Sequence, residues 1–127
     1  MEACLYVDDV FAAERFYRDV LGLTAFSKPT QRDLFFRCGD GMFLVFDANR
    51  TRIEDSEVPS HGAFGPGHIA FAIAGDRVDA WRNRLLDHGV VIEREINWPG
   101  GGRSLYFRDP AGNSVELATP KLWGLEA

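Results

Sequence analysis

The fold of this chain is decided by the stretch Gly65-Pro66-Gly67-His68-Ile69-Ala70-Phe71-Ala72-Ile73. Its glycines and proline favour a turn, and the residues after them alternate between bulky and small side chains. In a β-strand, Ile69, Phe71 and Ile73 share one face and enter a core, whereas His68 shares the other face with two alanines. Most isolated strand histidines are merely packed or solvated, but the small neighbours of His68 leave room for a bound group.

A second stretch, Asp109–Leu117, supplies a carboxylate in a comparable position. Its Asp-Pro-Ala-Gly sequence predicts a turn that leads into a short strand. Val115 and Leu117 would face one side of that strand and Glu116 the other. Imidazole nitrogen and carboxylate oxygen are common ligands of divalent metals, so His68 and Glu116 are candidates for one shared ion.

The order of elements around these two strands occurs twice in the chain. Each half is predicted to run strand, helix, strand, strand, strand, which gives an α+β protein made of two βαβββ modules. Asp8 or Asp9 is expected to cap the first helix and Asp76 the second. A single module leaves one face of its sheet uncovered, so two modules are expected to pair into a half-barrel around a cleft.

The expected elements of the first half are a strand at 3–7, a helix at 10–21 and strands at 23–27, 33–38 and 42–46. Those of the second half are a strand at 68–73, a helix at about 77–88 and strands at 90–98, 103–108 and 114–118. We expect one domain over 1–127, with module one at about 1–48, a linker at about 49–66, module two at about 67–119 and a tail at 120–127. Within the linker, His61 is a candidate loop contact with the cleft, although most loop histidines are only solvated.

Composition narrows the class of protein. A chain of 127 residues is long enough for one real core, and its net charge of −5 argues against a nucleic-acid partner. The sequence shows neither an apolar stretch long enough to span a membrane nor a secretory signal. Cys4 and Cys38 stand in apolar surroundings and are expected to be buried free thiols. We therefore expect a soluble, cytoplasmic protein.

Three motifs resemble those of a known family, and together they cover almost the whole chain. They are Tyr6-Val7-Asp8-Asp9 before a helix with Phe16-Tyr17-Arg18-Asp19-Val20-Leu21-Gly22-Leu23, then Gly67-His68-Ile69-Ala70-Phe71, and Phe107-Arg108-Asp109-Pro110-Ala111-Gly112-Asn113-Ser114-Val115-Glu116-Leu117. This combination is similar to the vicinal oxygen chelate superfamily. Its members include glyoxalase I, fosfomycin and bleomycin resistance proteins, methylmalonyl-CoA epimerase and extradiol dioxygenases, so the resemblance specifies a fold rather than one reaction.

The resemblance implies metal ligands on four strands. The family's third and fourth ligand positions match His68 and Glu116, and its first position, often histidine, falls on Glu2. The second position falls on Leu44, or on Val45 if the alignment shifts by one residue, and neither side chain can bind a metal. The implied site therefore has three ligands, Glu2, His68 and Glu116, and suits Mn²⁺, Fe²⁺, Zn²⁺, Ni²⁺ or Mg²⁺.

Further residues are candidates for contact with a substrate in the expected cleft. Tyr6, Phe46 and Trp98 are aromatic, and Tyr106 lies on the strand before Glu116. Arg103 could bind a substrate carboxylate through paired hydrogen bonds, or it could be an ordinary surface arginine beside a glycine-rich turn. The aromatic residues could equally be core or dimer contacts.

Three functions remain open at this point. The first is a metal-dependent enzyme, a lyase, dioxygenase or transferase, that acts on a small oxygen-rich metabolite. The alternative is a metal-free protein of the bleomycin-resistance type that binds a drug or metabolite, and the third is a regulatory or scaffold module. The resemblance also implies a homodimer, in which modules pair either within one chain or between subunits.

Overall fold

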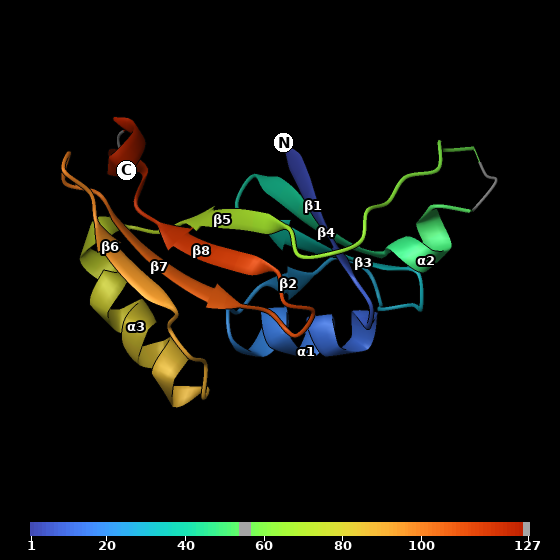
Figure 1. Ribbon diagram of the computed structural model, residues 1–127, viewed down its shortest axis with the longest axis horizontal. Helices are drawn as coiled ribbons and strands as arrows, with labels where there is room; N and C mark the ends of the chain where they lie inside the picture. Colours follow the sequence, from blue (N-terminus) through green and yellow to red (C-terminus); the bar gives the residue numbers. More distant parts are fainter. Residues whose placement is uncertain (54–56, 126–127) are drawn as a thin grey trace. The chain divides into compact units, whose positions relative to one another are not determined.

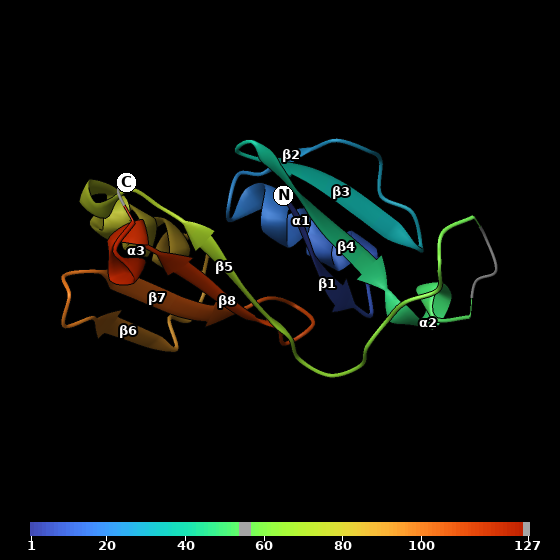
Figure 2. The ribbon, with the colours of Figure 1, turned by 90° about the horizontal axis from the view of Figure 1, so that it is seen from above.

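The computed structural model describes residues 1–53 and 57–125 and contains two βαβββ modules (Figures 1 and 2). By their internal contacts they form two compact units, Met1–Gly67 with Pro110–Gly112, and His68–Asp109 with the chain from Asn113 onward. Each unit holds one four-stranded mixed sheet. The predicted α+β fold with a repeated βαβββ module is confirmed.

The first sheet has the strand order β1-β4-β3-β2. Strands β1 and β4 are parallel, while β4 with β3 and β3 with β2 are antiparallel. The elements are β1 (Glu2–Val7), α1 (Val10–Asp19), β2 (Thr24–Ala25), β3 (Asp33–Cys38), β4 (Gly41–Asp47) and the short helix α2 (Ala48–Thr51).

Helix α1 covers one face of this sheet because its buried side chains match the buried alternate positions of the strands. Asp9 caps the helix by accepting hydrogen bonds from the backbone N–H groups of Phe11 and Ala12. Tyr17, fully buried, packs edge-on against Phe43 with ring centroids 4.8 Å apart. Among the described residues of this unit, no helix covers the opposite face of the sheet.

The second sheet repeats the arrangement with the order β5-β8-β7-β6. Here β5 and β8 are parallel and the other pairs antiparallel. The elements are β5 (His68–Ala72), the 3-10 turn η1 (Gly75–Arg77), α3 (Val78–Asp87), β6 (Arg94–Asn97), β7 (Arg103–Arg108), β8 (Ser114–Ala118) and the 3-10 turn η2 (Pro120–Trp123).

Strand register assigns each residue of the second sheet to one of its two faces. Val115 and Leu117 are buried on the face against which α3 packs, together with Leu105 and Phe107. The other face, called here the open face, presents one row from each strand. These rows are His68, Ala70 and Ala72 on β5, Ser114, Glu116 and Ala118 on β8, Ser104, Tyr106 and Arg108 on β7, and Arg94 and Ile96 on β6.

Several local expectations were wrong. The strand expected at 90–98 is limited to Arg94–Asn97. The Val90 N–H is still bonded to the Leu85 carbonyl oxygen of α3, and the ladder with β7 begins only at Arg94. Asp76 makes no capping hydrogen bond to α3. Cys4 is exposed and Cys38 is partly exposed, although both are free thiols as expected, because Cys4 lies on the helix-free face of β1.

Two further features are the absence of a membrane-spanning helix among the described residues and the packing of the tail. In the described part of the chain, no helix has the length and apolarity needed to cross a membrane. The tail begins with η2, whose Leu122 lies against Gly102, so a side chain at Gly102 would collide with the Leu122 backbone. Trp123 and Leu125 of this tail are exposed.

Candidate functional site

His68 and Glu116 lie side by side on the open face of the second sheet. The two residues belong to the parallel strands β5 and β8, and His68 Nε2 is 3.3 Å from Glu116 Oε1. The His68 side chain is 52% exposed and that of Glu116 only 10%. The pair therefore offers one accessible nitrogen beside a carboxylate that is largely shielded from water.

Ser114 fixes the orientation of the His68 ring. His68 Nδ1 is 3.1 Å from the Ser114 carbonyl oxygen and 3.2 Å from its hydroxyl oxygen. Because a carbonyl oxygen can only accept, Nδ1 carries the proton, and Nε2 of the neutral ring is an acceptor. Nε2 then faces a carboxylate oxygen, another acceptor, and this arrangement requires a proton or a cation between the two.

The second oxygen of Glu116 is held by a chain of hydrogen bonds. The fully buried Ser104 hydroxyl donates to Glu116 Oε2 at 2.5 Å and accepts from the indole N–H of Trp98 at 2.9 Å. Trp98, a candidate for substrate contact, is thus placed beside Ser104. Metal-binding histidines and carboxylates are commonly held in place by further hydrogen bonds of this kind.

Tyr106 completes this group on the central strand β7. Its ring stacks near that of His68, with centroids 6.4 Å apart and an interplanar angle of 22°. Burial and then the interaction with Glu116 raise the pKa of the Tyr106 phenol above its ordinary value. The phenol therefore stays protonated, and can donate a hydrogen bond, over a wide pH range.

The third ligand implied by the resemblance, Glu2, belongs to the first unit. It begins β1 and is paired in register with Met42 of β4. Leu44 lies on the same helix-free face of that sheet, whereas Val45 is fully buried on the helix-covered face. Among residues 1–53 and 57–125, no three His, Cys, Asp or Glu side chains gather into a metal-binding group.

A second group of predicted residues comes together in the first unit. The Tyr6 hydroxyl is 2.7 Å from His61 Nδ1, and the His61 ring lies edge-on to Phe46 with centroids 4.7 Å apart. The backbone N–H of His61 donates to the Thr51 carbonyl oxygen, and this bond holds the loop at His61 beside α2. Burial is the main cause of the raised pKa of Tyr6. Tyr6, Phe46 and His61 thus form an aromatic cluster.

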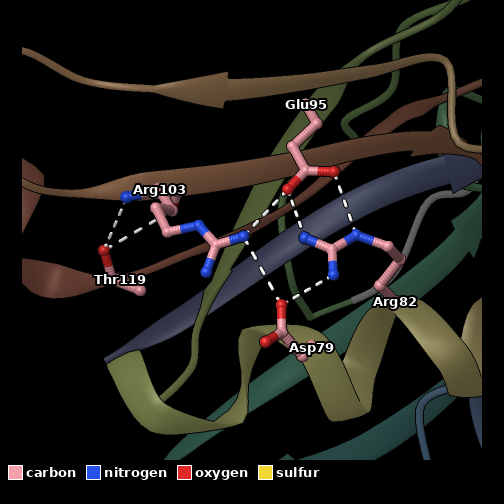
Figure 3. Close-up of polar contacts among 5 residues, drawn as sticks. All are labelled: Asp79, Arg82, Glu95, Arg103 and Thr119. Carbon is pink, nitrogen blue, oxygen red and sulfur yellow. Dashed lines mark hydrogen bonds and ion pairs between the residues drawn. The ribbon is translucent and has the colours of Figure 1, made fainter.

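Arg103 does not join His68 and Glu116, because it lies on the opposite, helix-covered face of the second sheet (Figure 3). Its Nη2 is 3.0 Å from Glu95 Oε1 and 3.5 Å from Asp79 Oδ1. Arg82 of α3 binds the same two carboxylates. Hydrogen bonds from Arg82 are the main cause of the lowered pKa values of Glu95 and Asp79. This network ties α3 to β6 and β7.

Two serines near the pair were missed by sequence reasoning. Ser114 lies two residues before Glu116, and Ser104 lies two residues before Tyr106, so strand alternation already put both on the open face. The Ser114 contact depends on the pairing of β8 with β5, and the Ser104 contact on the pairing of β7 with β8, which a single strand pattern does not specify. The sequence could therefore predict that both serines lie on the open face, but not which side chains they contact.

Comparison with known proteins gives a consistent family. A family model described as the Glyoxalase/Bleomycin resistance protein/Dioxygenase superfamily matches residues 2–117. A solved structure described as lactoylglutathione lyase from Agrobacterium tumefaciens has a TM-score of 0.94 and 44% identity, covering 98% of this chain and 96% of that chain.

Curated relatives include three proteins named metallothiol transferase FosB. The one from Bacillus licheniformis is 30% identical over 118 residues, which are 89% of this chain and 70% of that protein. The one from Shouchella clausii is 41% identical over 59 residues, so the match spans only 43% of this chain and 39% of that protein.

Proposed function

Because the chain belongs to the Glyoxalase/Bleomycin resistance protein/Dioxygenase superfamily, we propose that it is a metal-dependent enzyme acting on a small oxygen-rich metabolite. The proposed ligands are His68, Glu116 and Glu2, and the proposed cofactor is one divalent ion among Mn²⁺, Fe²⁺, Zn²⁺, Ni²⁺ and Mg²⁺. When bound, such an ion would act as a Lewis acid on substrate oxygens.

One observation carries this proposal. His68 Nε2 and Glu116 Oε1 face each other at 3.3 Å, although the contact of Nδ1 with the Ser114 carbonyl leaves Nε2 as an acceptor. A cation shared by both atoms would turn two opposed lone pairs into two ligand bonds. Imidazole nitrogen and carboxylate oxygen are a donor set that all five ions accept, so the residues fit the cofactor.

The surrounding residues have distinct parts in this proposal. Ser104 and Ser114 hold the two ligand side chains, and Trp98 holds Ser104. The Tyr106 phenol, kept protonated by its raised pKa, would donate a hydrogen bond to a substrate oxygen that gains negative charge. Tyr106 is therefore the residue proposed to stabilise an oxyanion.

The names of the relatives favour a lyase or a thiol transferase over other chemistry. The lactoylglutathione lyase similarity covers nearly the whole chain, and the metallothiol transferase similarity covers most of it. We propose lyase or transferase activity on a small molecule, with dioxygenase activity as a family possibility. Assays for cleavage of lactoylglutathione, and for transfer of small thiols to electrophiles, test the two classes directly.

A metal-free binding protein remains the second candidate. The aromatic cluster of Tyr6, Phe46 and His61 favours it, since these rings could pack against a flat ligand. The absence of a third donor within the described part of either unit also favours it. In that case His68 and Glu116 would share a proton and serve only as polar groups.

The proposed site has consequences for assembly. The proposed site needs Glu2 to join the other two ligands. We therefore propose that the helix-free face of a first sheet pairs with the open face of a second sheet, either within one chain or between the subunits of a homodimer. Mixing Glu2→Gln chains with His68→Ala chains tests the second case, because one intact site would form in each mixed dimer.

Two free cysteines support a cytoplasmic location, where thiols remain reduced.

Metal binding is the decisive experiment. Metal content and calorimetric titration are measured on the wild type, His68→Ala, Glu116→Gln and Glu2→Gln, with Glu57→Gln, exposed and outside both groups, as matched control. We expect about one ion per site in the wild type, affinity losses of about tenfold or more in the three ligand variants, and no loss in the control. A wild type that binds none of the five ions refutes the metal-dependent function and leaves the binding protein.

A further inference from the structure

The second unit holds a cavity of about 530 Å³, called here the tail cavity. It lies between the turn that joins β6 to β7 and the chain that follows β8, and its wall includes Gly100, Gly101, Arg103, Thr119, Lys121 and Leu125. Arg103 lies on the helix-covered face of the sheet, whereas His68 and Glu116 lie on the open face. Within the described part of the chain, none of the residues around the proposed metal pair lines the tail cavity, so the two sites are separate.

The Arg103 guanidinium in this wall has only one of its three nitrogens engaged. Nη2 contacts Glu95 and Asp79, whereas Nε is buried and has no hydrogen-bond partner among the described residues. Nη1 makes no hydrogen bond or ion pair with those residues either, and Figure 3 shows it directed away from both carboxylates. A buried donor is normally paired with a protein atom, a water or a ligand, so Arg103 has unused capacity for an acceptor.

The Thr119 hydroxyl is a second donor with unused capacity. Thr119 is only 4% exposed, and its Oγ1 accepts a hydrogen bond from the backbone N–H of Arg103 at 2.9 Å. Its own proton has a single contact, 3.5 Å long, with the Arg103 carbonyl oxygen, which already accepts the Thr119 backbone N–H at 3.0 Å. Ordinary O–H···O hydrogen bonds are about 2.5–3.0 Å long, so this hydroxyl proton is available to a better acceptor in the tail cavity.

Lys121 gives the tail cavity its net positive charge. Its side chain folds over the turn at Gly101, where an added Cβ would lie 3.3 Å from the Lys121 Nζ. The ammonium group makes no ion pair with any acidic side chain of residues 1–53 and 57–125. The two arginines of Figure 3 are balanced by the two carboxylates that they share, so one positive charge remains.

We propose that the tail cavity binds the carboxylate of a small organic acid, at a site that does not depend on the proposed metal function. An ionised carboxylate only accepts hydrogen bonds, as the donors of Arg103 and Thr119 require, and its single negative charge matches the charge of Lys121. The cavity volume is typical of pockets that hold small organic molecules, and Leu125 offers an apolar wall for the body of the acid. A bound acid would tie Lys121 of the tail to Arg103 of β7.

The first arm of the test compares benzoate with benzamide, which share a ring and a shape and differ in charge. Calorimetry is done on the full, metal-free chain. We expect the wild type and the control Lys28→Gln to bind benzoate about fivefold more tightly than benzamide, and Lys121→Gln to lose this preference. Arg103→Lys keeps a positive charge beside Glu95 but removes the Nε donor, and should weaken benzoate binding about tenfold. Equal binding of the two probes by the wild type, or an unchanged preference in Lys121→Gln, overturns the site; Lys121 is exposed, so this variant keeps the fold.

The second arm locates the bound acid and checks its chemical class. Benzoate is titrated into the metal-free protein while NMR follows the backbone amide signals. We expect saturable shifts at Gly100, Gly101 and Gly124 and none at His68 or Glu116; shifts only at the last two, or none at all, refute the tail cavity as the site. Phenyl phosphate, which carries the same ring on a dianion, should bind no more tightly than benzoate, and tighter binding overturns the carboxylate assignment. Failure of the protein to bind metal would refute the proposed function and leave these responses in place.

Discussion

Ser104→Ala is predicted to destabilise the second unit and to weaken its metal site. The substitution removes the hydrogen bond to Glu116 Oε2, which is 2.5 Å long, and the acceptor of the Trp98 indole N–H. A hydrogen bond to a charged group is worth about 1.5–3 kcal/mol, and a partly buried donor left without a partner costs about 1 kcal/mol more. Because Ser104 is fully buried, water replaces little of this loss, and we expect about 2.5–4 kcal/mol in total.

Urea unfolding followed by far-ultraviolet circular dichroism measures this change, with Ser60→Ala, an exposed serine, as the matched control. Trp98→Phe removes the indole donor together with part of the ring, and the loss of the donor alone is expected to cost about 1 kcal/mol. The double variant should then cost less than the sum of the single ones, because both changes break the same hydrogen bond. A Ser104→Ala protein within about 0.5 kcal/mol of the wild type would refute the proposed hydrogen-bond chain.

Four further predictions follow from other contacts. Absorbance titration should show one fewer tyrosine ionising above the ordinary range in Tyr106→Phe than in the wild type, where Tyr6 also has a raised pKa. Because the folded pKa of Tyr106 is raised, its stabilising contribution is present below pH about 10 and is lost as the pH rises further. In Arg82→Gln, the free energy of unfolding should depend less on pH in the acidic range. Glu95 and Asp79 have lowered pKa values, so their contribution to stability is present at neutral pH and lost as the pH falls below about 4. An unchanged pH dependence in urea unfolding would contradict this. Asp9→Ala should destabilise the first unit by about 1 kcal/mol by urea unfolding, and Asp9→Asn by less, since asparagine also caps helices. Leu44→Glu should raise divalent-metal affinity in calorimetry, whereas Val45→Glu should unfold the first unit, because only Leu44 lies on the helix-free face.

The fold was predictable because its signals are local and occur twice. Alternation in His68–Ile73 and the cap at Asp9 depend on neighbouring residues, and both agree with the structure. The shortened strand at Arg94–Asn97 was less predictable, since its alternation continues upstream into residues that precede the ladder with β7. The exposure of Cys4 depends on which face of the sheet helix α1 covers, and the sequence of strand β1 does not indicate which face that is.

The site was predictable only as far as strand faces determine it. Alternation alone places His68 and Glu116 on equivalent faces of their strands, and the two side chains do meet. Arg103 was a candidate for the cleft because a guanidinium can bind a substrate carboxylate through paired hydrogen bonds, but it precedes Tyr106 by an odd number of positions on the same strand. That odd spacing in fact turns Arg103 to the helix side, where Glu95 and Asp79 hold it.

The repeated register explains why the proposed site has three ligands rather than four. In module two, His68 begins β5, and Glu116 pairs with Ala70, two residues later. In module one, Glu2 begins β1, and the residue that pairs two positions later is Leu44, opposite Cys4. Leu44 is therefore the counterpart of Glu116, and its side chain has no donor atom. The two modules together offer three donors, and the proposed site would keep coordination positions open for a substrate, as Lewis-acid catalysis requires.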